Sequence, residues 1–257
     1  MEYFTCLLST SVQPDSHLNR EWAISEGLFK PNKGVVLGKG SAQGVSLQRF
    51  DIKKKAIWRE EIRKQFQILE DAKVFSFVGR IVPQKGVNEL MEAFLRINRK
   101  DTFLFILGAP DEIDSLDQDL LEKVKAMDNV VFTGSVSDPE RYVAASDYFV
   151  LPSYREGFPN TILEAGALGV PSIMTKINGM IDLIIEGKTG FVCEIKSVET
   201  LFESMSKALS QTSEEYKTMS DNVYTTVKND FDAEYIKECF YQNRQKLIKK
   251  ANCVTDV

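Results

Sequence analysis

The fold is decided by residues 73–95, which read KVFSFVGRIVPQKGVNELMEAFL. The first six residues are mostly apolar and end at Gly79, as a buried strand ends before a turn. From Val87 onward, apolar side chains recur at the i, i+3, i+4 spacing of a helix with one buried face, and we expect that helix over 87–100. A strand, a turn and a helix in this order are typical of a parallel sheet with crossover helices.

The same alternation continues along most of the chain and predicts an α/β protein. We expect a doubly wound, Rossmann-like parallel sheet with helices on both faces and extra helices at its C-terminal end. Ligands of such sheets bind beyond the carboxyl ends of the strands, so the loops there are where chemistry is expected. Strands are predicted at 34–37, 73–78, 102–107, 130–133, 148–151, 171–174 and 191–194, and further helices at 18–26, 197–210, 213–228 and 233–250.

The composition excludes several classes of function. Of the 257 residues, 43% are apolar and 27% are charged, the balance of an ordinary globular protein. A net charge of -5 gives no electrostatic case for binding nucleic acid. The four cysteines form no Cys-x-x-Cys pair and His17 is the single histidine, so no zinc cluster is expected and a reducing compartment is favoured.

The sequence carries no signal for export or for a membrane span. Its first residues lack the basic start of a signal peptide, and nowhere do about 18 apolar residues follow one another. We therefore expect a cytoplasmic protein. The segment 233–250 is rich in Lys and Arg, which favours a solvated helical face over contact with the inner face of a membrane.

The turn after the strand at 73–78 carries two cations, Arg80 and Lys85, just before the predicted helix. The unpaired N–H groups and the dipole of a helix N-terminus favour anions, so these side chains could hold a diphosphate. The alternative is that Arg80 caps or salt-bridges a neighbouring loop while Lys85 is solvated. These residues alone do not decide between the two.

A second motif, SYREGFPNTILE at 153–164, places Glu156 in a loop and Glu164 about one turn into a helix. Gly157 would let a ligand approach the backbone, and the free N–H groups from Phe158 to Thr161 suit hydroxyl or phosphate oxygens. However, Thr161 and Glu164 also match a capping box, and taken alone Glu164 is better explained as a cap. Glu156 could likewise be an ordinary exposed acid.

Two other patterns are set aside. The Asp117-Gln118-Asp119 spacing is used for metal and nucleotide in other proteins, but here it opens a helical stretch, whose dipole acids complement. The glycine-rich segment 38–44 fits neither the dinucleotide nor the Walker spacing.

Together these motifs resemble the C-terminal, donor-binding domain of the retaining glycosyltransferases of family four, the glycosyl transferases group 1 with the GT-B fold. Many of these enzymes build bacterial capsule and lipopolysaccharide. The resemblance runs from about residue 34 to about residue 207 and rests on an ordered set of motifs: Gly40-Ser41, Gly44-Val45 and Arg49-Phe50, then Gly79-Arg80 and Lys85-Gly86, then Phe132-Thr133-Gly134, then Glu156-Gly157-Phe158-Pro159 and Glu164-Ala165, then Gly187-Lys188-Thr189-Gly190-Phe191.

The resemblance implies a role for each matching position. Arg80 and Lys85 would hold the diphosphate and offset charge on the leaving group, which removes the need for a metal or cofactor. Glu164 would bind the ribose, and Glu156 would address the donor sugar. The resemblance thus implies catalytic roles for Glu156, Arg80 and Lys85, and substrate binding by Gly79, Arg80, Lys85, Ser135, Val136, Glu156, Gly157, Phe158, Pro159, Asn160, Thr161 and Glu164.

The implied function is transfer of a sugar, with retained configuration, from a UDP- or GDP-linked donor to a glycan or lipid-linked acceptor. Residues 31–230 would form the nucleotide-sugar-binding domain, 231–257 a C-terminal helix and tail, and 1–30 the end of an acceptor-side domain. The rest of that domain would come from a separate polypeptide, or would have been lost from a truncated reading frame. The alternative is a non-catalytic remnant or subunit that binds a nucleotide sugar.

The sequence departs from the family at one motif. Family members usually carry Asn-Gly-Val-Asp, where this chain has Gln43-Gly44-Val45-Ser46. A hydrolase or a signalling receiver domain is disfavoured, because neither a nucleophile elbow nor an acidic phosphorylation cluster is apparent.

Overall fold

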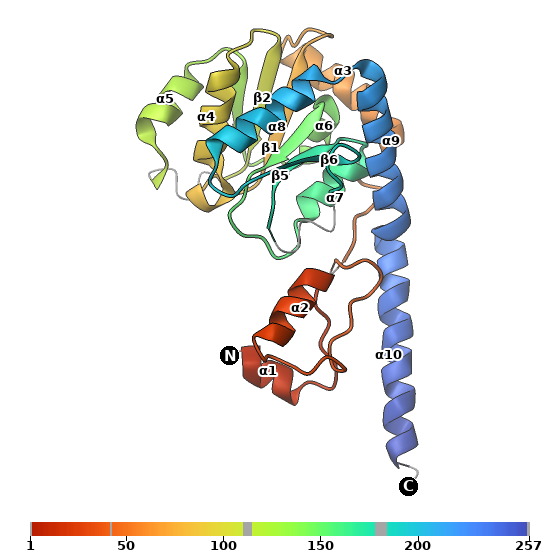
Figure 1. Ribbon diagram of the computed structural model, residues 1–257. Helices are drawn as coiled ribbons and strands as arrows, with labels where there is room; N and C mark the ends of the chain where they lie inside the picture. The colour runs from red at the N-terminus through yellow and green to blue at the C-terminus, as the bar shows by residue number, and fades with distance from the viewer. Residues whose placement is uncertain (1, 42, 110–114, 178–183, 256–257) are drawn as a thin grey trace.

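The computed structural model describes residues 2–41, 43–109, 115–177 and 184–255. A six-stranded parallel sheet in the order β3-β2-β1-β4-β5-β6 forms its centre, which confirms the predicted doubly wound α/β fold (Figure 1). The direction in which successive strands are added reverses between β1 and β4. The strands are β1 (Lys73–Val78), β2 (Thr102–Leu107), β3 (Val130–Gly134), β4 (Tyr148–Leu151), β5 (Ser172–Thr175) and β6 (Gly190–Cys193).

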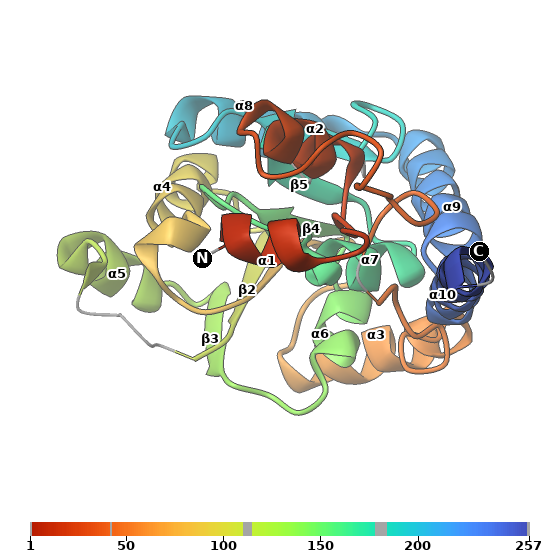
Figure 2. The ribbon, with the colours of Figure 1, turned by 90° about the horizontal axis from the view of Figure 1, so that it is seen from below.

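Helices cover both faces of the sheet, as Figure 2 shows from below. On one face α4 packs against α5 and α8, and on the other α3 packs against α6, and α7 against α6 and α9. The helices are α3 (Lys55–Gln65), α4 (Val87–Ile97), α5 (Gln118–Lys125), α6 (Pro139–Ala145), α7 (Asn160–Ala167), α8 (Val198–Ser210) and α9 (Ser213–Asp230), with 3-10 turns η1 (Ile52–Lys54) and η2 (Pro83–Lys85).

The strand and helix that decide the fold pack as their patterns predict. All six side chains of β2 are buried, and so are four of the six of β1, which lies beside it. The apolar face of α4 contributes Val87, Leu90 and Phe94 to the core. The helix ends at Ile97, three residues earlier than predicted, because Asn98 takes a left-handed conformation (φ 44°) that closes it.

The N-terminal segment lies beyond the carboxyl edge of the sheet, beside α10 (Ala233–Thr255) (Figure 1). It carries α1 (Glu2–Leu8) and α2 (His17–Ser25). Just before α10 begins, Val45 forms a parallel bridge with Asp232. No helix in the described part of the chain is long and apolar enough to cross a membrane.

The predicted strand at 34–37 is wrong. Within this run, Gly34 forms an isolated bridge with Val12, and its carbonyl oxygen accepts a hydrogen bond from Arg20 at 2.9 Å. Val35 is 37% exposed. A short apolar run does not by itself determine strand pairing, and this one lies outside the sheet.

A buried ion network joins the amino ends of β1 and β4 to helix α3. Asp147, just before β4, pairs with Arg59 at 2.8 Å and with Arg63 at 2.9 Å, both on α3. Its carboxylate also accepts a hydrogen bond from the Val74 amide at 2.8 Å. The Arg63 guanidinium donates as well to the carbonyl oxygens of four residues: Leu69, Glu70, Ala72 and Ala145.

Replacing Asp147 with alanine should destabilise the protein by about 3–5 kcal/mol, because the buried Arg63 guanidinium would lose its counter-charge. Urea denaturation measures this loss. The matched control is Asp221→Ala, which removes an exposed ion pair with Lys217 and should change the free energy of unfolding by less than about 1 kcal/mol. Equal losses in the two variants would show that the Asp147 network does not stabilise the fold.

Candidate functional site

The loops after β1 and β4 meet at the point where the strand order reverses. Gly86 ends the first loop in a left-handed conformation (φ 71°), and a Cβ there would overlap the carbonyl oxygen of Pro152 in the second. The Tyr154 amide donates a hydrogen bond to the Gln84 carbonyl oxygen at 2.9 Å. The two loops are therefore held in direct contact, and glycine is required at position 86.

Lys85 and Glu156, predicted separately, form an ion pair across these loops. The Lys85 Nζ lies 2.5 Å from Glu156 Oε1, and the side chains are only 22% and 13% exposed. The Ser153 hydroxyl donates to the same carboxylate oxygen at 2.8 Å. Lys85 is thus not simply solvated, and Glu156 is not an ordinary exposed acid. The sequence did not predict that these two residues would pair.

Arg80, on the loop after β1, is exposed. Within the described residues it forms no ion pair, so the salt bridge considered as an alternative is not found there. The backbone beside it is fixed, because the Gly79 amide donates to the Leu107 carbonyl oxygen at 2.9 Å. Gly108 lies so close that a Cβ there would overlap the Gly79 carbonyl oxygen. A rigid backbone therefore presents a guanidinium whose charge is not neutralised by these residues.

The capping-box interpretation of Glu164 is wrong. Helix α7 has Pro159 at its N-cap position and no side-chain cap, so Thr161 lies inside the helix. The Glu164 side chain is partly buried, and this burial raises the pKa of its carboxyl. The Arg49 guanidinium opposes that rise, and the Glu140 carboxylate adds to it.

The loop after β3 lies near this carboxyl. Ser135 is exposed and Val136 is partly buried, packing against the core on the α3 and α6 side of the sheet. Arg49 pairs with Glu140 at 3.0 Å and approaches the Ser137 carbonyl oxygen at 3.4 Å. Arg49 belongs to one of the sequence motifs, but no role was predicted for it. The residues to which it hydrogen-bonds lie about 90 residues further along the chain, where no local pattern reveals them.

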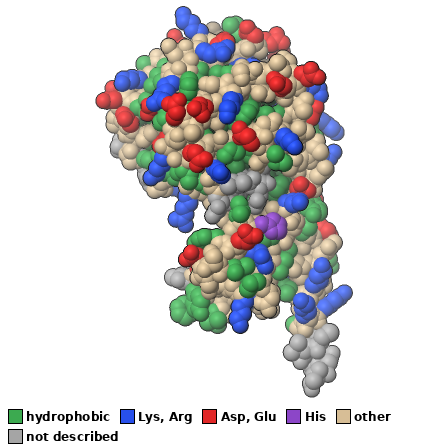
Figure 3. Space-filling model, in the orientation of Figure 1, with side chains coloured by type: hydrophobic (Ala, Val, Ile, Leu, Met, Phe, Trp, Pro, Cys, Tyr) green, Lys and Arg blue, Asp and Glu red, His purple; other side chains and the backbone are tan. Residues whose placement is uncertain are grey.

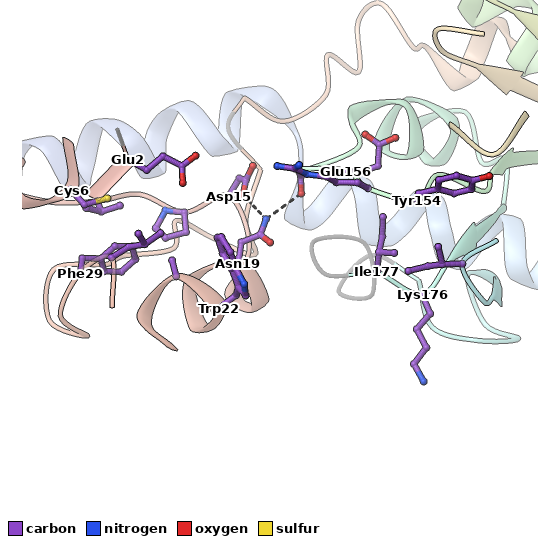
Figure 4. A pocket seen from close by; sticks show the side chains of 17 residues that line it. Glu2, Cys6, Asp15, Asn19, Trp22, Phe29, Tyr154, Glu156, Lys176 and Ile177 are labelled. Atoms are coloured by element: carbon purple, nitrogen blue, oxygen red, sulfur yellow. Dashed lines mark hydrogen bonds between the residues drawn. The ribbon is translucent and has the colours of Figure 1, made fainter. Parts of the chain in front are cut away.

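The N-terminal segment forms the opposite wall of the site, which sequence reasoning missed. The Asn19 amide donates to Asp15 Oδ1 at 2.9 Å and to the Gly157 carbonyl oxygen at 3.2 Å. The Asp15 carbonyl oxygen accepts a hydrogen bond from the Ser41 amide at 2.6 Å. A cavity of about 890 Å³ lies between this wall and the loops carrying Glu156 (Figure 4).

The remaining residues of the predicted site lie at the start of α7 or just before it. Gly157 is exposed, Pro159 is buried, and Asn160 and Thr161 open α7. Phe158 packs against Phe231, with ring centroids 6.0 Å apart.

Asp117 caps a helix, as its context favoured. Its carboxylate accepts a hydrogen bond from the Leu120 amide at 3.0 Å at the start of α5. No group of three or more His, Cys, Asp and Glu side chains suited to a metal ion occurs among the described residues.

Replacing Glu164 with glutamine should stabilise the ligand-free protein at neutral pH. Burial raises the pKa of this carboxyl in the folded state, so the unfolded state releases its proton first and stability falls as the pH rises from about 4.5 through the folded pKa. Glutamine carries no such cost. Urea denaturation at pH 7 should show the gain, and at pH 4 the gain should disappear.

Glu215→Gln is the control, and the expected change in its stability has the opposite sign. The Thr212 backbone N–H holds the pKa of Glu215 below its usual value, so this variant should lose stability at neutral pH. If Glu164→Gln also raises the free energy of unfolding at pH 4, the stabilisation does not come from removing the buried charge.

Comparisons with known proteins identify relatives of this chain. The model of the family "Glycosyl transferases group 1" matches residues 58–226. The capsular polysaccharide biosynthesis glycosyltransferase CapM of Staphylococcus aureus is 33% identical over 240 residues, which cover 93% of this chain and 62% of CapM. A glycosyltransferase from Rickettsia africae has a similar structure, with a TM-score of 0.84 and 20% identity over 93% of this chain and 64% of that one.

Anabaena HepE, solved in complex with UDP and glucose, is similar in fold, with a TM-score of 0.80 and 19% identity, again over 93% of this chain and 64% of that one. The chain thus spans somewhat less than two thirds of the length of these proteins. The family match covers well over half of the chain and includes Arg80, Lys85, Glu156 and Glu164. The chain belongs to the glycosyl transferases group 1 family.

Proposed function

We propose that this chain binds a nucleoside-diphosphate sugar and takes part in transferring the sugar to a glycan or lipid-linked acceptor. The observation that carries the proposal is the ion pair of Lys85 with Glu156 at the carboxyl ends of β1 and β4, with the exposed Arg80 on the same loop as Lys85. Open α/β sheets bind their ligands at such a reversal of strand order. In a chain with a net charge of -5, these two cations supply the local positive charge that a diphosphate requires.

Each part of the donor has a corresponding group in the site. Arg80 and Lys85 hold the diphosphate from the loop at 79–86, with Gly79 allowing close backbone approach. Glu164 binds the ribose hydroxyls, and Ser135 and Val136 lie beside the base. Glu156 and the backbone at 157–161 bind the sugar, since the start of α7 has no side-chain cap to compete for its N–H groups.

The transfer that we propose breaks the bond between the anomeric carbon and the diphosphate oxygen, and forms a bond from that carbon to the acceptor hydroxyl oxygen. The hydroxyl proton passes to the departing phosphate oxygen. Arg80 and Lys85 offset the negative charge that develops there. Attack on the face from which the diphosphate departs retains the configuration, so a second carboxylate acting as nucleophile is not required.

The comparisons support this assignment and its biological setting. HepE binds UDP and glucose, and CapM acts in capsular polysaccharide biosynthesis. We place residues 31–230 in the nucleotide-sugar-binding unit and the acceptor among surface polysaccharide intermediates. A lipid-linked acceptor would bring the protein to the cytoplasmic face of a membrane.

A second candidate is a nucleotide-sugar-binding subunit that needs a partner chain for transfer. Helix α1 favours it, because four of its large apolar side chains are exposed: Tyr3, Phe4, Leu7 and Leu8. Figure 3 shows hydrophobic side chains gathered at the end of the molecule where Figure 1 places α1. Apolar patches of this kind are commonly covered by another polypeptide, here one carrying the acceptor-binding domain.

Arg80→Ala should weaken binding of UDP or GDP by roughly 10- to 100-fold, the loss expected when one charge-assisted hydrogen bond worth about 1.5–3 kcal/mol is removed. Isothermal titration calorimetry with UDP, GDP and their hexose conjugates measures the affinity. Stability should not change, because Arg80 is exposed and makes no ion pair with the described residues.

Lys100→Ala removes another exposed cation, near the amino end of β2, and should leave nucleotide affinity unaltered. If no diphosphate binds, or if Arg80→Ala binds as tightly as the unaltered protein, the donor site is assigned wrongly. Binding without transfer, even when an acceptor-side domain of a relative is added, would favour the second candidate.

A further inference from the structure

Lys85 meets a phosphate in the proposed donor site with a counter-charge already beside it. Its Nζ lies 2.5 Å from Glu156 Oε1, and the two side chains are only 22% and 13% exposed. Partial burial weakens the screening of these charges by solvent. A phosphate oxygen that accepts a hydrogen bond from Lys85 therefore also comes close to the Glu156 carboxylate.

The Glu156 carboxylate is held in this place by the loop that carries it. The buried Ser153 hydroxyl donates to Oε1 at 2.8 Å. The Ser153 carbonyl oxygen in turn accepts a hydrogen bond from the buried Thr175 hydroxyl on β5 at 2.5 Å. A rotation of the carboxylate away from Lys85 would break its hydrogen bonds with both Ser153 and Lys85. Its negative charge therefore stays near the position of the phosphate.

Two ligands of the proposed site meet this charge differently. A nucleoside-diphosphate sugar presents hydroxyl donors, for which a carboxylate is a strong acceptor. The free nucleoside diphosphate that remains after transfer has no sugar hydroxyls at this end. Its terminal phosphate also gains negative charge at neutral pH, because the second ionisation of a phosphate monoester has a pKa of about 6. The carboxylate thus accepts hydrogen bonds from the donor and repels the product.

We propose that Glu156 makes the site prefer the nucleoside-diphosphate sugar over the free nucleoside diphosphate. This inference rests on the proposed function and adds a step to it. Departure of the sugar removes the hydroxyls that bonded to Glu156, and the carboxylate then competes with the diphosphate for Lys85. The residue that binds the donor sugar therefore also favours release of the product.

The opposing explanation is that the ion pair only joins the two loops. These loops are also joined by backbone contacts that Glu156 does not supply. The Tyr154 amide donates to the Gln84 carbonyl oxygen at 2.9 Å, and Gly86 packs against the Pro152 carbonyl oxygen. A neutral side chain at position 156 should therefore leave the loops in place. The two explanations predict changes of opposite sign in the affinity for free nucleoside diphosphate.

Glu156→Gln removes the charge and nearly preserves the shape of the side chain. Isothermal titration calorimetry compares UDP with UDP-glucose, UDP-galactose and UDP-N-acetylglucosamine, and GDP with GDP-mannose. The free nucleoside diphosphate should bind this variant about three- to thirtyfold more tightly than it binds the unaltered protein, because a like charge is gone and Lys85 has lost its competing partner. The sugar conjugate loses charge-assisted hydrogen bonds at the same time, so the ratio of the two affinities should shift toward the product by about tenfold.

The dissociation rate gives a second measurement. In stopped-flow competition with a fluorescent nucleotide, free nucleoside diphosphate should leave Glu156→Gln more slowly than it leaves the unaltered protein, since affinity differences within one site lie mostly in dissociation.

Glu164→Gln is the matched control, because it removes another carboxylate of the proposed site. Glu164 is assigned to the ribose, which both ligands share. Its replacement should change the affinity for both ligands by the same factor and leave their ratio within about twofold. Urea denaturation without nucleotide checks that both variants are folded.

The outcomes distinguish this inference from the one on which it rests. If Glu156→Gln binds the free nucleoside diphosphate no more tightly than the unaltered protein does, or if both ligands change by the same factor, the proposed preference is wrong and the donor site stands. If neither UDP nor GDP binds to the unaltered protein, the proposed function itself fails.

Discussion

The close approach of Gly86 to the Pro152 carbonyl oxygen is the contact on which the site depends. It occurs where the strand order reverses, so that the loops after β1 and β4 leave neighbouring strands side by side. A side chain at position 86 would force these loops apart. Because Lys85 precedes this glycine directly, the same contact brings its ammonium to Glu156, 71 residues further along the chain. Backbone packing thus sets the distance between the two charges.

Because of this contact, only one of the two cations of the loop at 79–86 has a counter-ion within the part of the chain that the structure describes. Lys85 is neutralised by Glu156, whereas Arg80 is exposed and has no counter-ion among the described residues. If the chain binds a nucleoside-diphosphate sugar as proposed, the diphosphate would meet the Arg80 guanidinium first and would gain Lys85 only by sharing it with Glu156. The sugar attached to the diphosphate would bring hydroxyl donors to Glu156. Phosphate binding and sugar binding would then be coupled through this one ion pair.

The sequence predicted the sheet well because each strand and helix has a local signature. The runs at 73–78 and 102–107 and the helix from Val87 need only their own periodicity to be identified. The run at 34–37 failed because a four-residue apolar pattern does not say whether a partner strand is near. Thr161 and Glu164 fit a capping box only if α7 began after Thr161, whereas it begins at Asn160. The helix therefore begins two residues before the capping box requires, and Glu164 does not cap it.

The contacts that no local pattern reveals are those between distant segments. Asn19 reaches the Gly157 carbonyl oxygen across 138 residues, and the same amide holds the Asp15 carboxylate. Because Gly157 follows Glu156 directly, this bond ties the N-terminal segment, which carries Asp15 and Asn19, to the loop that would hold the donor sugar. A movement of that loop on ligand binding must either carry Asp15 and Asn19 with it or break the bond. Where the bond holds, the two walls of the cavity move together, which is the behaviour that a site would need if two substrates had to meet there in a fixed geometry.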